Sequence, residues 1–86
     1  MDEKLEKIGD VFTFFAKPMV AGIKISNGTL SIGDTILIKG MTTNIEMRVD
    51  SMQIDRKPVQ TVKVGDEVGI KVPDKVRPTD AVYKKA

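Results

Sequence analysis

One short motif recurs in this chain and limits what it can fold into: an apolar residue, then Gly-Asp, then residues that favour strands. The first copy is Ile32-Gly33-Asp34, and the second is Val64-Gly65-Asp66. Glycine adopts backbone conformations that cost other residues free energy, and aspartate accepts hydrogen bonds from nearby backbone. β-Branched positions follow both copies, so each copy predicts a tight turn that starts a β-strand.

Most of the chain alternates apolar and polar residues, which is the period of a strand with one buried face. Residues 19–25 and 68–72 follow this pattern, and each set marks one face turned to a core. In residues 45–54 the apolar positions change phase. A phase change of one residue predicts a β-bulge or a sharp coil, which we place at Asp50-Ser51.

Three local signals predict where strands start and stop. The pair Asn27-Gly28 between two apolar segments predicts a hairpin turn, and Lys57-Pro58 predicts the end of a strand. Residues 2–7 are compatible with one helical turn and equally with a frayed end. The remaining chain is predicted to be strand and turn.

The residue types that carry most enzyme and metal chemistry are missing. The chain has no cysteine and no histidine, so thiolate chemistry and the commonest proton shuttle and metal ligand are unavailable. Its seven glycines do not form the Gly-x-x-x-x-Gly-Lys-Ser/Thr loop that holds nucleotide phosphates. We therefore expect no GTPase or other enzyme activity, no metal and no cofactor.

The composition predicts the cellular location and the kind of source organism. No apolar run is long enough to span a membrane, and the first seven residues are too charged for a signal peptide, so we expect a cytoplasmic protein without a membrane partner. Charged residues make up 30% of the chain, a bias that suggests a thermophile. The net charge of +2 is too small for strong non-specific nucleic-acid binding, so any RNA contact must be local. The oligomeric state stays open.

In their order and spacing, these motifs resemble the second domain of the translational GTPases, the small β-barrel beside the nucleotide-binding domain in elongation factor Tu and initiation factor 2. The resemblance covers roughly residues 8–84 and is carried by Ile8-Gly9-Asp10-Val11, by Gly28, Leu30, Gly33 and Asp34, by residues 49–54, and by Gly65, Asp66, Val68, Gly69 and Ile70. Val62 stands where the family usually has alanine, which we interpret as a change in packing. The resemblance implies an all-β fold, a closed barrel of about six strands with Greek-key-like connections, in residues 8–86 after an extension of residues 1–7.

Aromatic residues provide the first candidate contact surface. In a regular strand, Phe12 and Phe14 face one way and Val11 and Phe15 the other, so both faces are apolar. One interpretation places one face in the core and covers the other with the N-terminal segment or the last strand. The other makes Phe12 and Phe14, with Lys17, a surface patch for a partner.

Basic residues provide the second candidate surface. Arg48, Arg56 and Lys57 are candidates for contacts with RNA phosphates, although the same charges would protect an edge strand from aggregation. Lys39 starts a loop with glycine and threonines, ending at Asn44, whose backbone amides are suited to phosphate but equally to an ordinary turn. Gly28, Gly33, Asp34, Gly65 and Asp66 are expected to build turns.

Two functions remain open at this point. The resemblance implies a non-enzymatic binding module that docks on ribosomal RNA, transfer RNA, the ribosome or a translation protein. Similar barrels also occur as accessory domains of enzymes, including some peptidases and proteins associated with RNA hydroxylation. The alternative is therefore an accessory protein-interaction subunit that positions a separate catalytic partner, and it would depend on the Phe12 and Phe14 patch more than on the basic residues.

Overall fold

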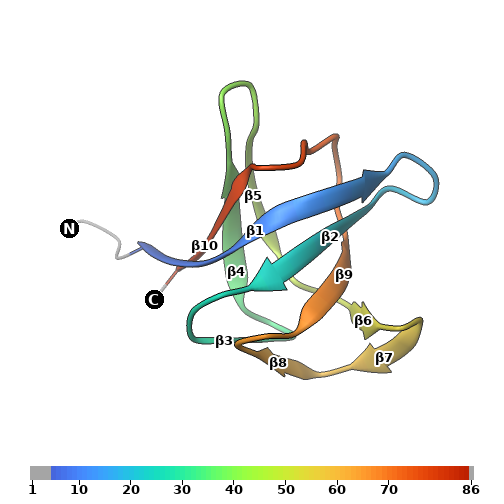
Figure 1. The fold of residues 1–86 in the computed structure, drawn as a ribbon. Helices are drawn as coiled ribbons and strands as arrows, with labels where there is room; N and C mark the ends of the chain where they lie inside the picture. The colour runs from blue at the N-terminus through green and yellow to red at the C-terminus, as the bar shows by residue number, and fades with distance from the viewer. Residues whose placement is uncertain (1–4, 86) are drawn as a thin grey trace.

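The computed structural model describes residues 5–85, which form strands, turns and bends and contain no helix (Figure 1). The strands are β1 (Leu5–Phe15), β2 (Val20–Ile25), β3 (Thr29–Ser31), β4 (Thr35–Lys39), β5 (Asn44–Arg48), β6 (Met52–Ile54), β7 (Lys57–Val59), β8 (Thr61–Lys63), β9 (Glu67–Lys71) and β10 (Ala81–Lys85). The all-β prediction is confirmed. The expected helical turn is wrong for residues 5–7, which belong to β1, and its other residues lie outside the described range.

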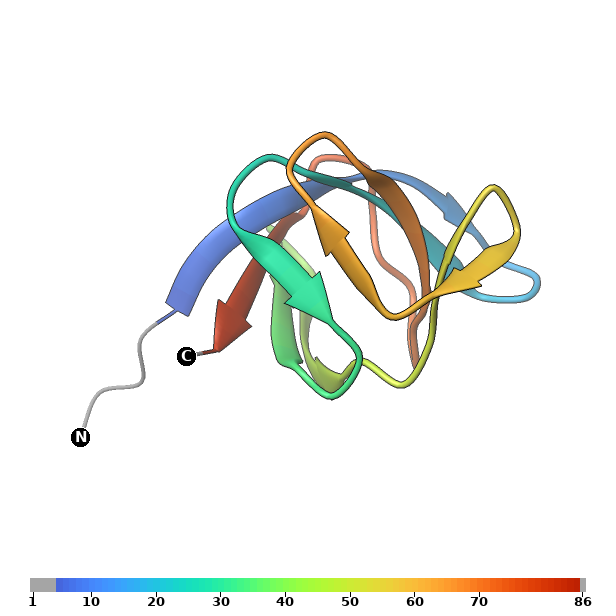
Figure 2. The ribbon, with the colours of Figure 1, turned by 90° about the horizontal axis from the view of Figure 1, so that it is seen from below.

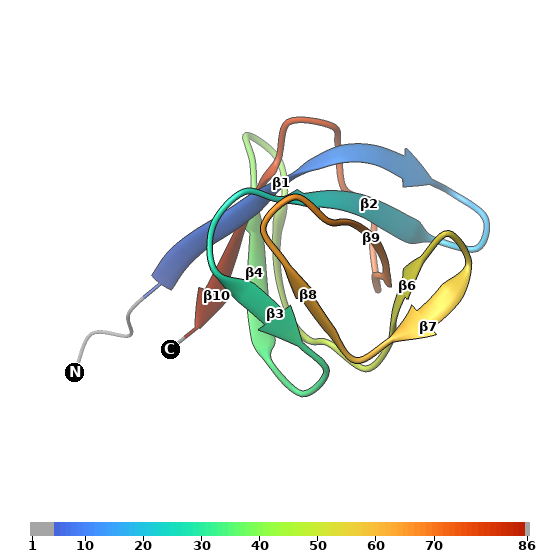
Figure 3. The ribbon, with the colours of Figure 1, turned by 60° about the horizontal axis from the view of Figure 1, so that its bottom comes forward.

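Eight of these strands form one antiparallel sheet in the order β5-β4-β10-β1-β2-β9-β6-β7. The other two, β3 and β8, pair with each other across the lower end of the curved sheet (Figure 3). The strands surround a common centre (Figure 2). The pairing differs from the expected closed barrel of six strands, because β5 and β7 end the larger sheet and do not pair with each other.

The buried faces follow the alternation of the sequence. In β2, Ala21, Ile23 and Ile25 are buried while Lys24 is exposed, and β4 and β9 alternate in the same way. The core comprises Ile8, Val11, Ala21, Ile23, Ile25, Leu30, Ile36, Ile38, Val49, Met52, Val62, Val68, Ile70, Val72, Val76 and Val82. Burial of this apolar surface is the main force that curls the sheet around one interior.

The connection at Asn27-Gly28 corrects the predicted hairpin. It joins β2 to β3, which lie in different sheets and do not pair. Backbone hydrogen bonds from Ser26 and Asn27 to the Ile8 carbonyl, of 2.7 and 3.1 Å, hold the connection against β1. Gly28 has a φ of 69°, so it still makes a turn, but the turn carries the chain from one sheet to the other.

The segment from residue 49 to residue 59 contains one confirmed and one wrong prediction. Residues 49–51 connect β5 to β6 outside any strand, which is the predicted coil, and the buried Val49 and Met52 lie on either side of Asp50-Ser51. Lys57-Pro58 does not end a strand, because both residues lie in β7. Proline is tolerated there because β7 is an edge strand and one row of its backbone groups needs no partner.

Candidate binding grooves

A β-bulge in β1 decides which phenylalanines reach the surface. The pairing of β1 with β2 shifts between Val11 and Thr13, so Phe12 is an extra residue in its strand. The shift reverses the alternation: Val11 is buried, Phe14 packs against the core, and Phe12 and Phe15 are 47% and 56% exposed. The expectation that Phe12 and Phe14 share a face is therefore wrong. The exposed pair is Phe12 and Phe15.

Two glycines in neighbouring strands create a groove beside these rings. Gly22 of β2 lies opposite Gly69 of β9. A Cβ on Gly22 would lie 2.6 Å from Thr13 Cγ2 and 3.0 Å from Phe12 Cζ. The side chains of Thr13 and Phe12 therefore pack directly over Gly22, where any larger residue would collide with them. The resulting glycine groove has a volume of about 290 Å³ and is lined by Phe12, Thr13, Phe15, Val20, Gly22, Gln53, Asp55, Arg56, Glu67, Val68 and Gly69.

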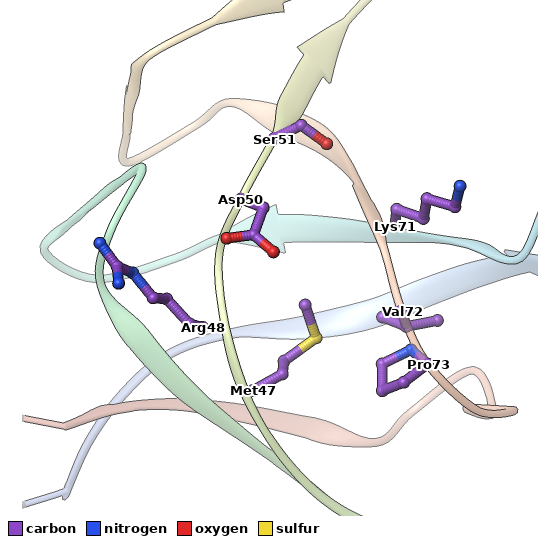
Figure 4. Close-up of a pocket in the computed structure, with 7 residues that line it drawn as sticks. All are labelled: Met47, Arg48, Asp50, Ser51, Lys71, Val72 and Pro73. Carbon is purple, nitrogen blue, oxygen red and sulfur yellow. The ribbon is translucent and has the colours of Figure 1, made fainter.

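A second groove runs between two segments that are far apart in the sequence (Figure 4). One side is formed by the end of β5 and the coil that follows, and the other by the end of β9 and the start of the next loop. This seam groove has a volume of about 400 Å³ and is lined by Met47, Arg48, Asp50, Ser51, Lys71, Val72 and Pro73. Met47 and Val72 point toward each other across it in Figure 4.

The structure distributes the candidate basic residues over different surfaces. Arg48 lines the seam groove, whereas Arg56 lines the glycine groove and Lys57 starts β7. Lys39 is exposed at the end of β4, and Lys17 is exposed in the connection between β1 and β2. The expected basic surface therefore does not form, because Arg48 and Arg56 line different grooves and Lys57 lines neither.

The loop after Lys39 already has a carboxylate beside it. A Cβ on Gly40 would collide with the carboxylate of Asp80, a residue that is only 5% exposed. The Gly40 N–H donates to the Thr43 carbonyl at 2.8 Å, which closes the loop on itself. Negative charge next to the glycine and an internally bonded amide both disfavour a phosphate at this position.

The residues that line the two grooves are suited to binding a ligand through apolar contacts and a few charged groups. Over residues 5–85, no three carboxylates gather in a way that would hold a metal ion. The glycine groove offers aromatic and aliphatic walls with charged residues at its rim, and the seam groove offers an apolar centre with charged ends.

Sequence analysis missed Phe15 as a surface residue, the glycine pair and the seam groove. One signal for the glycine pair was present, because an isolated glycine inside a strand indicates a bulge or a close approach of another group. Gly22 and Gly69 both stand at such positions. The seam groove left no local signal, since it depends on how residues 47–51 and 71–73 meet in space.

Comparison with known proteins identifies a family and several relatives of this chain. Residues 19–77 match the family described as elongation factor Tu domain 2. The chain is 47% identical over 78 residues to an uncharacterized protease of Methanocaldococcus jannaschii, a match that covers 90% of this chain and 19% of the protease. It is 33% identical over 78 residues to a collagenase of Porphyromonas gingivalis, covering 90% of this chain and 22% of the collagenase. The chain thus spans about a fifth of the length of these curated relatives.

A solved structure supports the fold. The C-terminal domain of a Geobacillus thermoleovorans protein assigned to the U32 peptidases superposes with a TM-score of 0.85 and covers 94% of this chain and 93% of that domain. The sequence identity of the pair is 17%, so the similarity concerns the fold alone.

These relatives correct the expected function. Docking on ribosomal RNA, transfer RNA or a translation protein was wrong, because the relatives that match 90% of the chain are named protease and collagenase. The motifs behind that expectation are turns and strand starts, which specify a fold. One fold serves many functions, and the turns do not distinguish a translation factor from a peptidase module.

Proposed function

This chain belongs to the elongation factor Tu domain 2 family, and we propose that it is a non-catalytic accessory module of U32-type peptidases. The observation that carries the proposal is the 47% identity to the Methanocaldococcus jannaschii protease over 19% of that protein's length. A module that makes up a fifth of an enzyme leaves the remaining four fifths to supply catalytic residues. The fold similarity to a C-terminal domain of a U32 peptidase supports the same assignment.

The glycine groove is the surface that we assign to the catalytic part of the peptidase. Phe12 packs over Gly22 and stays 47% exposed, and Phe15 is 56% exposed, so a partner side chain can contact both rings at the wall of the groove. Arg56 and Glu67 at the rim offer charges of both signs for orientation. Aromatic anchors surrounded by a polar rim are typical of protein interfaces.

Photochemical cross-linking tests the docking surface. The chain carrying p-benzoylphenylalanine in place of Phe15 is added to extract of the source cells, irradiated, and its cross-linked products are identified by mass spectrometry. The expected product joins this chain to a peptidase-family polypeptide. The matched control carries the same probe in place of Val64, which is also 56% exposed but lies in a turn outside the groove lining.

Two results would contradict the proposal. Equal cross-linking from positions 15 and 64 would remove the glycine groove as the contact surface. Hydrolysis of labelled casein or gelatin by the purified chain alone would show that the module is itself catalytic.

A further inference from the structure

Strand β5 presents a free edge beside the seam groove. It pairs with β4 on one side and is the last strand of the eight-stranded sheet on the other. An edge strand leaves a row of backbone N–H and C=O groups available, which makes it a template for another extended chain. In this molecule the row lies next to a groove of about 400 Å³.

The hydrogen bonds flanking β5 show which residues turn their backbone toward that edge. The Gly40 N–H donates to the Thr43 carbonyl and the Val49 N–H donates to the Asp34 carbonyl, both at 2.8 Å. Residues that pair by hydrogen bonds alternate along an antiparallel strand, so the odd-numbered residues of β5 bond to β4. Asn44, Glu46 and Arg48 therefore turn N–H and C=O away from β4, and all are exposed.

The other sheet edges are poorly suited to take a strand. β7, β3 and β8 contain three residues each, whereas β5 contains five. Pro58 removes a backbone donor from the middle of β7, and the neighbouring Lys57 adds charge, both of which discourage pairing. β5 has no proline, and its Ile45 and Met47 are half-buried.

Side chains of the seam groove suit an extended peptide. Met47 lies across from Val72 and Pro73, forming an apolar site for one side chain of a bound strand (Figure 4). Arg48 and Lys71 lie at the ends of the groove against a single carboxylate, that of Asp50. The excess of one positive charge favours a peptide with an acidic side chain.

We propose that the edge of β5 and the seam groove bind an extended polypeptide segment as an added antiparallel or parallel strand. The bound strand donates to and accepts from the outward backbone groups of Asn44, Glu46 and Arg48, and one of its apolar side chains contacts Met47. This inference rests on the proposed function only in naming a peptidase substrate as the source of the polypeptide. Peptide binding itself is tested on the purified chain alone.

The experiment measures fluorescence polarisation of a short fluorescein-labelled peptide of alternating valine and threonine with a central glutamate. We expect saturable binding that shifts the amide NMR signals of Asn44, Glu46 and Arg48. Glu46→Pro removes the outward donor without removing a bond to β4, and it is expected to weaken binding by about tenfold. Glu46→Ala keeps the N–H and loses the 2.7 Å ion pair with Lys85, so it is expected to change binding by less than about twofold.

A modified peptide tests the same backbone contacts on the unaltered protein, so the result does not depend on whether the protein variants fold. Methylation of alternate backbone nitrogens eliminates the donors of the peptide and keeps its side chains, so binding to the unaltered protein is expected to disappear. Replacement of the central glutamate by lysine is expected to weaken binding more modestly.

Three results would overturn the proposal. The first is absence of saturable binding, and the second is equal binding of the methylated peptide. The third is a dimer in solution that Glu46→Pro dissociates, which would assign the edge to a second copy of this chain. None of these results bears on the cross-linking from Phe15, so the two proposals fail separately.

Discussion

Three turns share one set of hydrogen bonds, yet two of them contain glycine and the third does not. They are Ser31-Ile32-Gly33-Asp34, Lys63-Val64-Gly65-Asp66 and Arg77-Pro78-Thr79-Asp80. In each turn the backbone N–H of the first residue donates to the carboxylate of the aspartate, at 2.9, 3.0 and 2.9 Å in chain order. The backbone N–H of the aspartate donates to the carbonyl of the first residue, at 3.1, 3.0 and 3.1 Å. The aspartate bonds are therefore common to all three turns, and glycine is not.

The third position shows what glycine contributes. Its φ is 98° at Gly33, 96° at Gly65 and 80° at Thr79, and positive φ is strained for a β-branched residue. The bonds to the neighbouring strand are also the same in all three turns. The Thr79 N–H donates to the Val11 carbonyl and the Val11 N–H donates to the Asp80 carbonyl, both at 2.8 Å. Val49 exchanges the equivalent two bonds with Gly33 and Asp34 at 2.8 Å, and Ile25 exchanges them with Gly65 and Asp66 at 2.9 Å. Surrounding bonds thus maintain a conformation that glycine adopts at lower cost.

The largest expected effect in this comparison is at Asp80. Asp80→Ala leaves the Arg77 N–H without its partner in a partly buried bond whose aspartate is only 5% exposed, so the free energy of unfolding should fall by about 2 kcal/mol. Asp66→Ala removes the equivalent bond where water can replace it, and the loss should be about 1 kcal/mol or less. Urea unfolding followed by circular dichroism measures both. Equal losses at the two sites would show that burial does not distinguish the turns.

An intermediate effect is expected at Gly65. A Cβ at this position would meet no atom within 4 Å, so Gly65→Ala tests backbone strain without a steric clash. The free energy of unfolding should fall by about 1 kcal/mol. Gly65→Asn is the matched control and should lose less, since asparagine tolerates positive φ better than alanine does. An alanine variant as stable as the parent would remove the role assigned to glycine in the first two turns.

The sequence predicted most of the strands because alternation is a local signal. Ala21, Ile23 and Ile25 are buried as their spacing requires, and the chain leaves the ladder at Asp50-Ser51 where the phase changes. The Thr79 turn escaped prediction because threonine gives no turn signal comparable to glycine, although its backbone hydrogen bonds match those of the other two turns. The local sequence therefore identified the two turns that contain glycine and missed the third, in which threonine adopts the same positive φ.

The candidate sites were less predictable for a similar reason. The bulge in β1 has no glycine or proline at Phe12, so strict alternation assigned Phe14 to the surface in place of Phe15. The seam groove requires the ends of β5 and β9 to meet, which is a property of the sheet order. Function was harder still, since the turns that identify the family are shared by translation factors and peptidase modules.

The smallest effect is expected at Thr79, where a substitution should raise the free energy of unfolding instead of lowering it. Thr79→Gly relieves strain of about 1–2 kcal/mol in the folded state, and the greater freedom of glycine in the unfolded chain costs about 1 kcal/mol. The Asp80 bonds do not involve the threonine side chain, so the variant should gain up to about 1 kcal/mol in the free energy of unfolding. Thr42→Gly is the control, because Thr42 lies in an exposed loop without positive φ and should be neutral or slightly destabilised. If Thr79→Gly loses as much stability as Thr42→Gly, the positive φ at residue 79 carries no strain, and glycine at the other two turns would need another explanation.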